Sequence, residues 1–157
     1  MAKAPSPPSA EPEELIHPLS DKPGHLMRRA MQRSSAAYSE EAREFGITGP
    51  QHVILVALAH NPGVDQNTLA ELVDLDRWTT GDIVARLERA GLVVREVNPR
   101  DRRGRLLFLP PAGRRLVRDM APAVVRTQQR FLAPLSAEEQ RQFLHLLRKL
   151  VGLEPPA

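Results

Sequence analysis

The sequence predicts a mainly α-helical protein with one small β hairpin. After residue 22, apolar residues recur at helical spacing over most of the chain, and polar capping residues precede the helical stretches. The pattern becomes extended only after Gly91, in two short segments that flank a polar loop. A chain of 157 residues is the size of one domain, or of one domain with a dimerisation arm.

The composition excludes several classes of protein. The chain has no cysteine, which removes disulfides and thiolate metal sites. No apolar run approaches the ~20 residues that cross a bilayer, and the N-terminus lacks an apolar block of the signal-peptide type. We therefore expect a cytoplasmic protein without membrane contact. We also expect no metal, because metal-ligand spacing is missing among His17, His25, His52, His60 and His145.

The first half of the chain contains several residues that typically start or end helices. Residues 1–20 are proline-rich and are predicted to be a disordered tail. A long helix is predicted from Pro23, with Asp21 as its cap, to the residue before Gly46. The residues Thr48 and Gln51 fit a capping box for the next helix, which is predicted to stop at Asn-Pro-Gly, residues 61–63.

Two short helices and a hairpin are predicted next. Asp65 caps the first helix, a tight turn over residues 74–76 follows, and Asp76 caps the second helix, which ends at Gly91. The strands are predicted over residues 92–97 and 106–109. Their connecting loop contributes to a run of four arginines in the six positions 100–105.

The last third of the chain is predicted to be helical again. Pro111 and Gly113 open one stretch, and Pro122 inside it predicts a kink or a new start. Ser136 and Glu139 fit a second capping box for a closing helix. Residues 116–151 carry an apolar surplus, and a helix with such a stripe has to bury it.

Two helices joined by a tight turn and followed by an arginine-rich hairpin indicate a winged helix-turn-helix. Such a unit places its second helix in the major groove of DNA. The predicted DNA contacts on that helix are Arg77, Trp78, Thr79, Gly81, Asp82 and Arg86, and those on the wing, directed to the minor groove, are Arg100, Arg102, Arg103 and Arg105. Asp82 is expected to accept from a cytosine amino group or to orient Arg86.

Each feature alone also has an ordinary explanation. Helical hairpins are common without DNA, and an arginine-rich loop is more often only solvated. The order and spacing of the two features are more specific than either one. Neither a phosphate-binding glycine loop nor a nucleophile motif occurs, so we expect no enzyme activity and no cofactor. The alternatives that stay open are a non-specific DNA-coating protein and a winged helix for protein contact, neither of which would respond to a ligand.

Three runs of residues carry a family resemblance: Asp65-Gln-Asn-Thr-Leu-Ala70, Arg86-Leu-Glu-Arg-Ala-Gly-Leu92 and Asp101-Arg-Arg103. Through them the stretch from Pro62 to Gly113 resembles the MarR (multiple antibiotic resistance regulator) family, whose Asp-x-Arg wing motif the last run matches. It extends more weakly over residues 22–152. Where the family often has Ser-Thr-x-Ser-Arg, this chain has Trp78-Thr-Thr-Gly-Asp82, so the family's base contacts do not carry over.

The resemblance implies a symmetric homodimer that binds an inverted-repeat site in double-stranded DNA. It implies a division into helical dimerisation segments, residues 21–45 and 111–152, and a DNA-binding lobe, residues 46–110. It also implies a repressor that is released from DNA by a small effector. The sequence of residues 62–82 is most similar to that of regulators of aromatic-acid catabolism. This similarity favours an aromatic acid or its coenzyme A thioester as the effector.

The resemblance places the effector between the dimer helices and the DNA-binding lobe. The residues whose positions suit that place are Arg28, Met31, Ser35, Tyr38 and His52. Arg28 is expected to pair with a carboxylate or phosphate. Each has an ordinary alternative: Arg28 as a surface residue, Met31 and Tyr38 as core residues, and His52 as a helix-start residue.

Overall fold

The computed structural model describes residues 18–153 and confirms a mainly helical fold with a two-stranded wing. Most of the predicted tail, residues 1–17, lies outside the described residues. The elements are α1 Pro23–Glu41, α2 Gly49–His60, α3 Gln66–Leu72, α4 Arg77–Arg89, β1 Val94–Val97, β2 Arg105–Phe108, α5 Pro111–Leu132 and α6 Ala137–Leu150, with 3-10 turns at Leu19–Asp21 and Arg43–Phe45.

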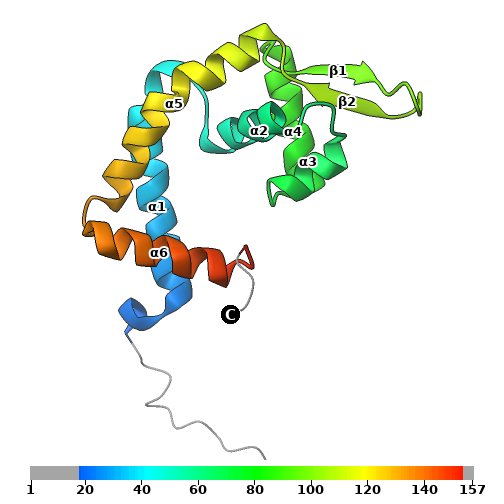
Figure 1. Ribbon diagram of the computed structural model, residues 1–157. Helices are drawn as coiled ribbons and strands as arrows, with labels where there is room; N and C mark the ends of the chain where they lie inside the picture. The colour runs from blue at the N-terminus through cyan, green and yellow to red at the C-terminus, as the bar shows by residue number, and fades with distance from the viewer. Residues whose placement is uncertain (1–17, 154–157) are drawn as a thin grey trace, which may run out of the picture.

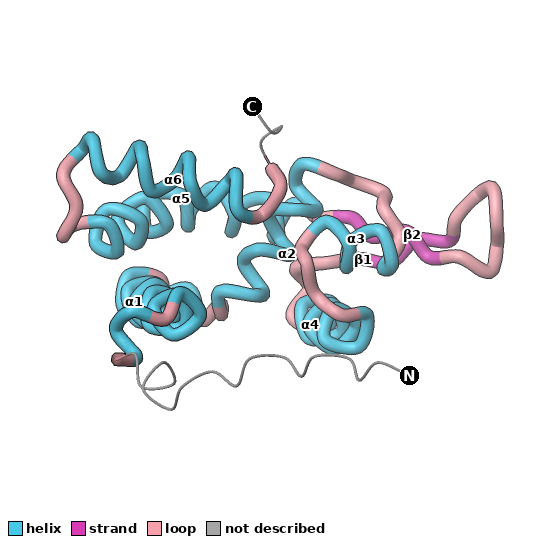
Figure 2. Tube along the Cα trace, turned by 90° about the horizontal axis from the view of Figure 1, so that it is seen from below, coloured by secondary structure: helices cyan, strands magenta, loops and turns pink. Residues whose placement is uncertain are grey.

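The helices form two groups (Figure 1). On one side α5 runs alongside α1, and α6 crosses near the lower end of α1. On the other side α2, α3 and α4 cluster, and the hairpin of β1 and β2 projects outward from them. Figure 2 shows the same division along a perpendicular direction, with the wing loop at the far end from α1. We call the first group the helical arm and the second group the lobe.

The lobe has a closed apolar core. The side chains that form it are at most 2% exposed and come from all its helices and from the wing: Ile54, Leu55, Leu58, Leu69, Val84, Leu87, Val93, Leu107 and Leu109. One polar side chain, Thr80 on α4, is fully buried as well, and its hydroxyl has no partner among the described residues.

The helix starts follow the local sequence with one exception. Both capping boxes form, at Thr48–Gln51 and at Ser136–Glu139. The prediction that Asp21 caps α1 is wrong. Lys22 occupies the N-cap position without a side-chain hydrogen bond, because Asp21 belongs to the preceding 3-10 turn and Pro23 begins the helix. Helix α1 also ends earlier than expected, at Glu41, and the chain reaches Gly46 through the second 3-10 turn.

Helix α5 is continuous through Pro122, so the alternative of a new helix start there is wrong. Its axis changes direction part-way along its length (Figure 1), as a proline inside a helix requires. The beginning of α5 packs tightly on the lobe. A Cβ at Gly113 would lie 2.3 Å from the Leu92 carbonyl oxygen, so this position admits only glycine.

The wing is an antiparallel pair in which Val94 faces Phe108 and Val97 faces Arg105. The first strand begins later than the predicted residue 92. Leu92 and Val93 precede the pairing, and Val93 belongs to the core of the lobe instead. The second strand starts and ends one residue before the prediction, which was 106–109.

The arm buries a few side chains between α1 and α5, among them Ala37, Met120 and Ala123, and ion pairs link the same two helices, but apolar surface stays uncovered. Glu41 on α1 pairs with Arg126 on α5, at 2.7 Å from carboxylate oxygen to Nε, and Arg130 pairs with Glu40 and Glu41. Helix α6 has no buried residue, and Leu146 and Leu150 are 54% and 68% exposed. None of the helices within residues 18–153 combines the length and the apolar character that a membrane span needs.

Candidate DNA-contacting surface and effector pocket

The helix-turn-helix is built by two aspartate caps. Asp65 accepts from the backbone amides of Asn67 and Thr68 at 2.8 and 3.1 Å, and so starts α3. Asp76 accepts from the Thr79 amide at 2.9 Å and from its hydroxyl at 2.6 Å, and so starts α4. The hydrogen bonds from Thr79 hold the pKa of Asp76 below its ordinary value. The two caps set the residue at which each helix begins, as the sequence predicted.

The outer face of α4 combines an apolar and a charged part. Trp78 is 89% exposed, and Arg77 and Thr79 flank it in the first turn. One turn further, Asp82 and Arg86 form an ion pair at 3.6 Å in which both side chains are largely exposed. The geometry therefore matches the alternative in which Asp82 orients Arg86. The Thr79 hydroxyl is already engaged by Asp76.

Sequence analysis did not single out Gln66, the first residue of α3. Its side-chain amide reaches across to α4 and donates to the Arg77 carbonyl oxygen at 3.5 Å. It lies over Gly81, where an added Cβ would come within 2.8 Å of Gln66 Nε2. The absence of a side chain at position 81 thus makes room for an amide from another helix, and no signal in the local sequence of Gln66 reveals this contact.

The wing loop presents exposed arginines on an ordered turn. The Asp101 carboxylate accepts from the Arg103 amide at 3.0 Å, and Asn98 accepts from the Arg100 amide at 2.9 Å. Arg105 donates to the backbone carbonyl oxygens of Arg102 and Gly104. Within residues 18–153 none of the arginines in this loop has a carboxylate partner, so their guanidinium groups remain available for phosphate.

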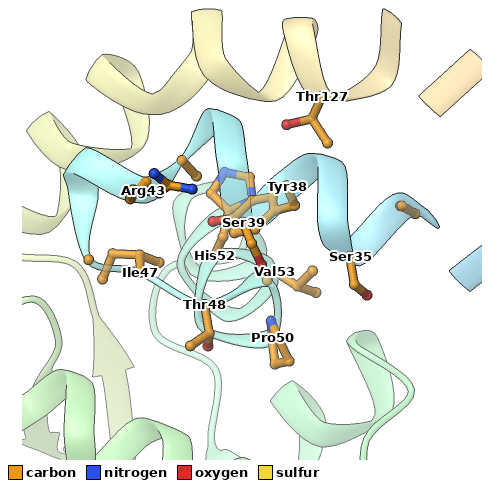
Figure 3. A pocket seen from close by; sticks show the side chains of 14 residues that line it. Ser35, Tyr38, Ser39, Arg43, Ile47, Thr48, Pro50, His52, Val53 and Thr127 are labelled. Atoms are coloured by element: carbon orange, nitrogen blue, oxygen red, sulfur yellow. The ribbon is translucent and has the colours of Figure 1, made fainter. Parts of the chain in front are cut away.

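A pocket of about 580 Å³ lies where the arm meets the lobe. Figure 3 shows Tyr38 of α1 and His52 of α2 in its middle, with Arg43 and Ser35 to either side and Thr127 of α5 above. The lining residues are Ser34, Ser35, Tyr38, Ser39, Ala42, Arg43, Gly46, Ile47, Thr48, Gly49, Pro50, His52, Val53 and Thr127.

The centre of the pocket is aromatic and uncharged. The rings of Tyr38 and His52 are 5.9 Å apart and tilted. Burial raises the pKa of the Tyr38 hydroxyl to about 12, and this buried hydroxyl has no partner among the described residues. Burial lowers the pKa of His52, so the imidazole is neutral at pH 7. The pocket thus offers an unused hydroxyl donor beside a neutral ring.

The structure brings together three of the five predicted effector residues: Ser35, Tyr38 and His52 line this pocket. Met31 lines a separate apolar cavity of about 450 Å³ between α1, α5 and α6. Arg28 is exposed and lies 3.4 Å from the His25 ring nitrogen, outside both cavities. The cation at the main pocket is instead Arg43, which sequence analysis missed because it lies on the 3-10 turn after α1.

Comparisons with known proteins agree with this fold. A family model described as the MarR family matches residues 45–104. The transcriptional regulator HosA of Escherichia coli O111:H- is 33% identical over 85% of this chain and 98% of its own length. The chain belongs to the MarR family. The transcriptional repressor NicR of Pseudomonas putida is 31% identical over 100% of this chain and 99% of its own length.

Three solved structures place this MarR-family chain among winged-helix transcriptional regulators. PcaV from Streptomyces coelicolor, in complex with its natural ligand, is 39% identical with a TM-score of 0.77, covering 87% of this chain and 96% of PcaV. BpsR from Bordetella bronchiseptica, whose DNA binding is regulated by 6-hydroxynicotinic acid, is 30% identical with a TM-score of 0.81, covering 86% and 96%. The repressor CouR, bound to a 23-mer DNA duplex, is 27% identical with a TM-score of 0.80, covering 85% and 94%.

Proposed function

We propose that this protein is a homodimeric repressor, not an enzyme, that binds an inverted-repeat DNA site and leaves it when a small aromatic acid binds. The observation that carries the proposal is the pocket between arm and lobe, with its unpartnered Tyr38 hydroxyl, neutral His52 and adjoining Arg43. The ligand-regulated DNA binding of BpsR supports the same role.

The proposed effector follows from the chemistry of the pocket. Apolar surface and two rings favour an aromatic body. Arg43 is the only charged residue among those that line the pocket, and it forms no ion pair within residues 18–153, so it favours a carboxylate. A volume of about 580 Å³ suits a small aromatic acid. A coenzyme A thioester would have to extend from the pocket into solvent.

The position of the pocket supplies the coupling. Tyr38 and Ser35 belong to the arm, whereas His52 and Val53 belong to α2 of the lobe. A ligand that touches both groups favours one angle between them over another. In a symmetric dimer that angle sets the separation of the two α4 helices, which must match half-sites about one DNA turn, ~34 Å, apart. A ligand with different affinities for the two arrangements therefore weakens DNA binding.

Fluorescence anisotropy with the DNA upstream of the protein's own gene tests the proposal. We expect saturable binding that survives excess unrelated DNA and is reversed by 6-hydroxynicotinic acid or hydroxybenzoates. Binding that the competitor abolishes would indicate a DNA-coating protein, and no binding to any DNA would indicate a protein-contact module. A response to aryl-coenzyme A thioesters alone would reassign the effector.

Matched variants separate the two sites. Arg103→Ala should weaken DNA affinity, and its control Arg118→Ala on α5 should not, because only the first side chain lies on the wing. Tyr38→Phe and Arg43→Gln should leave DNA affinity unchanged but raise the acid concentration needed for release. Full acid sensitivity in both pocket variants would remove this pocket from the mechanism.

A further inference from the structure

The most exposed large apolar side chain of the described residues lies on the proposed DNA-contacting surface. At 89% exposure, Trp78 exceeds every other large apolar side chain within residues 18–153. It is the second residue of α4, and a helix-turn-helix places the N-terminal residues of its second helix against base edges. When a partner removes such an indole from water, the free energy of the system falls, so binding is favoured.

The surface beside the indole is hollow. A depression of about 370 Å³ is lined by Gln66, Arg77, Trp78, Gly81 and Asp82. Gly81 follows Trp78 by three residues, so the two share a face of α4, and the glycine leaves a low floor next to the ring. The amide of Gln66 lies against that floor, held by its hydrogen bond to the Arg77 carbonyl oxygen.

One base fits this chemistry best. In the major groove only thymine presents a methyl group, and its O4 acceptor lies next to that methyl. An indole offers an apolar face and a single N–H donor. Cytosine presents an amino donor where thymine has O4, so it would place a donor against the indole N–H and leave the apolar face without a methyl group.

We propose that Trp78 recognises thymine in each half-site, with the C5 methyl group against the indole and over Gly81. The inference rests on the proposed function, because it requires α4 in the major groove. It assigns a base to a position at which this chain departs from the Ser-Thr-x-Ser-Arg pattern of its family. It also gives Gln66 the role of a positioning residue that shapes the depression.

Replacement of thymine by uracil tests the contact, because the two bases differ only by the methyl group. The full-length protein selects its sites from a random-sequence duplex pool, and each thymine of the enriched site is then replaced by deoxyuridine. At one thymine per half-site we expect affinity to fall about four-fold, the effect of one buried methyl group. Replacement in both half-sites should give about fifteen-fold.

Variants tie the effect to the indole. Trp78→Ala should bind the thymine and uracil sites equally, and its exposure means that the free energy of unfolding should not change. Val125→Ala, which truncates an exposed apolar side chain on α5, is the control and should keep the four-fold preference. Gly81→Ala should reduce the preference, because its Cβ meets the Gln66 amide and raises the floor.

The outcomes are separable. A pool without any enriched site overturns the proposed function and this inference with it. An enriched site that tolerates uracil at every thymine overturns the inference alone. A four-fold preference that persists in Trp78→Ala overturns it too, because the methyl group then contacts another residue. An unchanged preference in Gly81→Ala overturns the placement over the glycine.

Discussion

The lobe and the helical arm solve the burial of apolar side chains differently. In the lobe three helices and the wing close around one core whose members are at most 2% exposed. In the arm α6 has no buried residue, and Leu146 and Leu150 face outward. The lobe is therefore complete within one chain. The arm is complete only when something covers it, and the proposed dimer would supply a second copy of the same helices.

The proposed effector pocket lies on the boundary between these two groups. Tyr38 comes from the arm and His52 from the lobe, and their rings are 5.9 Å apart. Residues of α4 and β2 share the closed core of the lobe, so we expect a ligand at the boundary to move the lobe as a unit. The difference between the two regions suggests a division of roles: the proposed DNA contacts belong to the lobe alone, whereas the proposed effector pocket needs residues from both groups.

The largest expected effect comes from the core of the lobe. Leu58→Ala should lower the free energy of unfolding by about 2–5 kcal/mol, because Leu58 is 1% exposed and its loss leaves a cavity. In urea denaturation the midpoint of unfolding should fall by an amount that does not depend on protein concentration. Leu146→Ala is the comparison in the arm. Its effect should disappear as the protein is diluted to the monomer, since it is the proposed dimer that would bury this side chain.

A smaller effect is expected from charges placed on the uncovered face of α6. The double variant Leu146→Glu/Leu150→Glu should weaken dimerisation at least about ten-fold, because association would bury unpaired carboxylates. Sedimentation velocity should show a larger fraction of monomer. Circular dichroism should show unchanged helical content. Leu72→Glu, on the exposed side of α3, is the matched control. A dimer that withstands the double variant would place the interface elsewhere.

The smallest effect concerns His52. Burial lowers its folded-state pKa, so the folded protein binds this proton less readily than the unfolded chain. Stability is therefore fully present above the ordinary pKa of 6.5 and is lost as the pH falls toward the lower folded-state pKa. His52→Gln should remove this part of the pH dependence of unfolding, which lies below the ordinary pKa of 6.5. An unaltered profile would show that His52 is solvated.

Most predictions from sequence succeeded where the deciding contacts are local, and the cap expected at Asp21 was the exception. The caps at Asp65 and Asp76 involve amides two or three residues away, so the residue types alone identify them. The strand at residue 92 was predicted too early because an apolar run does not distinguish a paired strand from a core segment. Val93 is buried by the helices of the lobe, whereas pairing begins only at Val94.

The binding sites divide in the same way. The exposed face of α4 follows from helical periodicity, so its candidate residues could be named in advance. Gln66 and Arg43 could not be named, because each reaches its site across a contact between different elements. Arg28 has the charge expected for an effector ligand, but α1 directs it away from the pocket and a 3-10 turn brings Arg43 there instead.

The sequence by itself determined the helices, most of their caps and the wing, because these depend on periodicity and on hydrogen bonds within a few residues. It also indicated the family, through the resemblance of residues 62–113. Only the tertiary structure decided which side chains meet at the boundary of arm and lobe, and that an amide from α3 lies over Gly81. Such contacts depend on how packed helices are oriented, and that orientation is fixed by the whole core and not by any single segment.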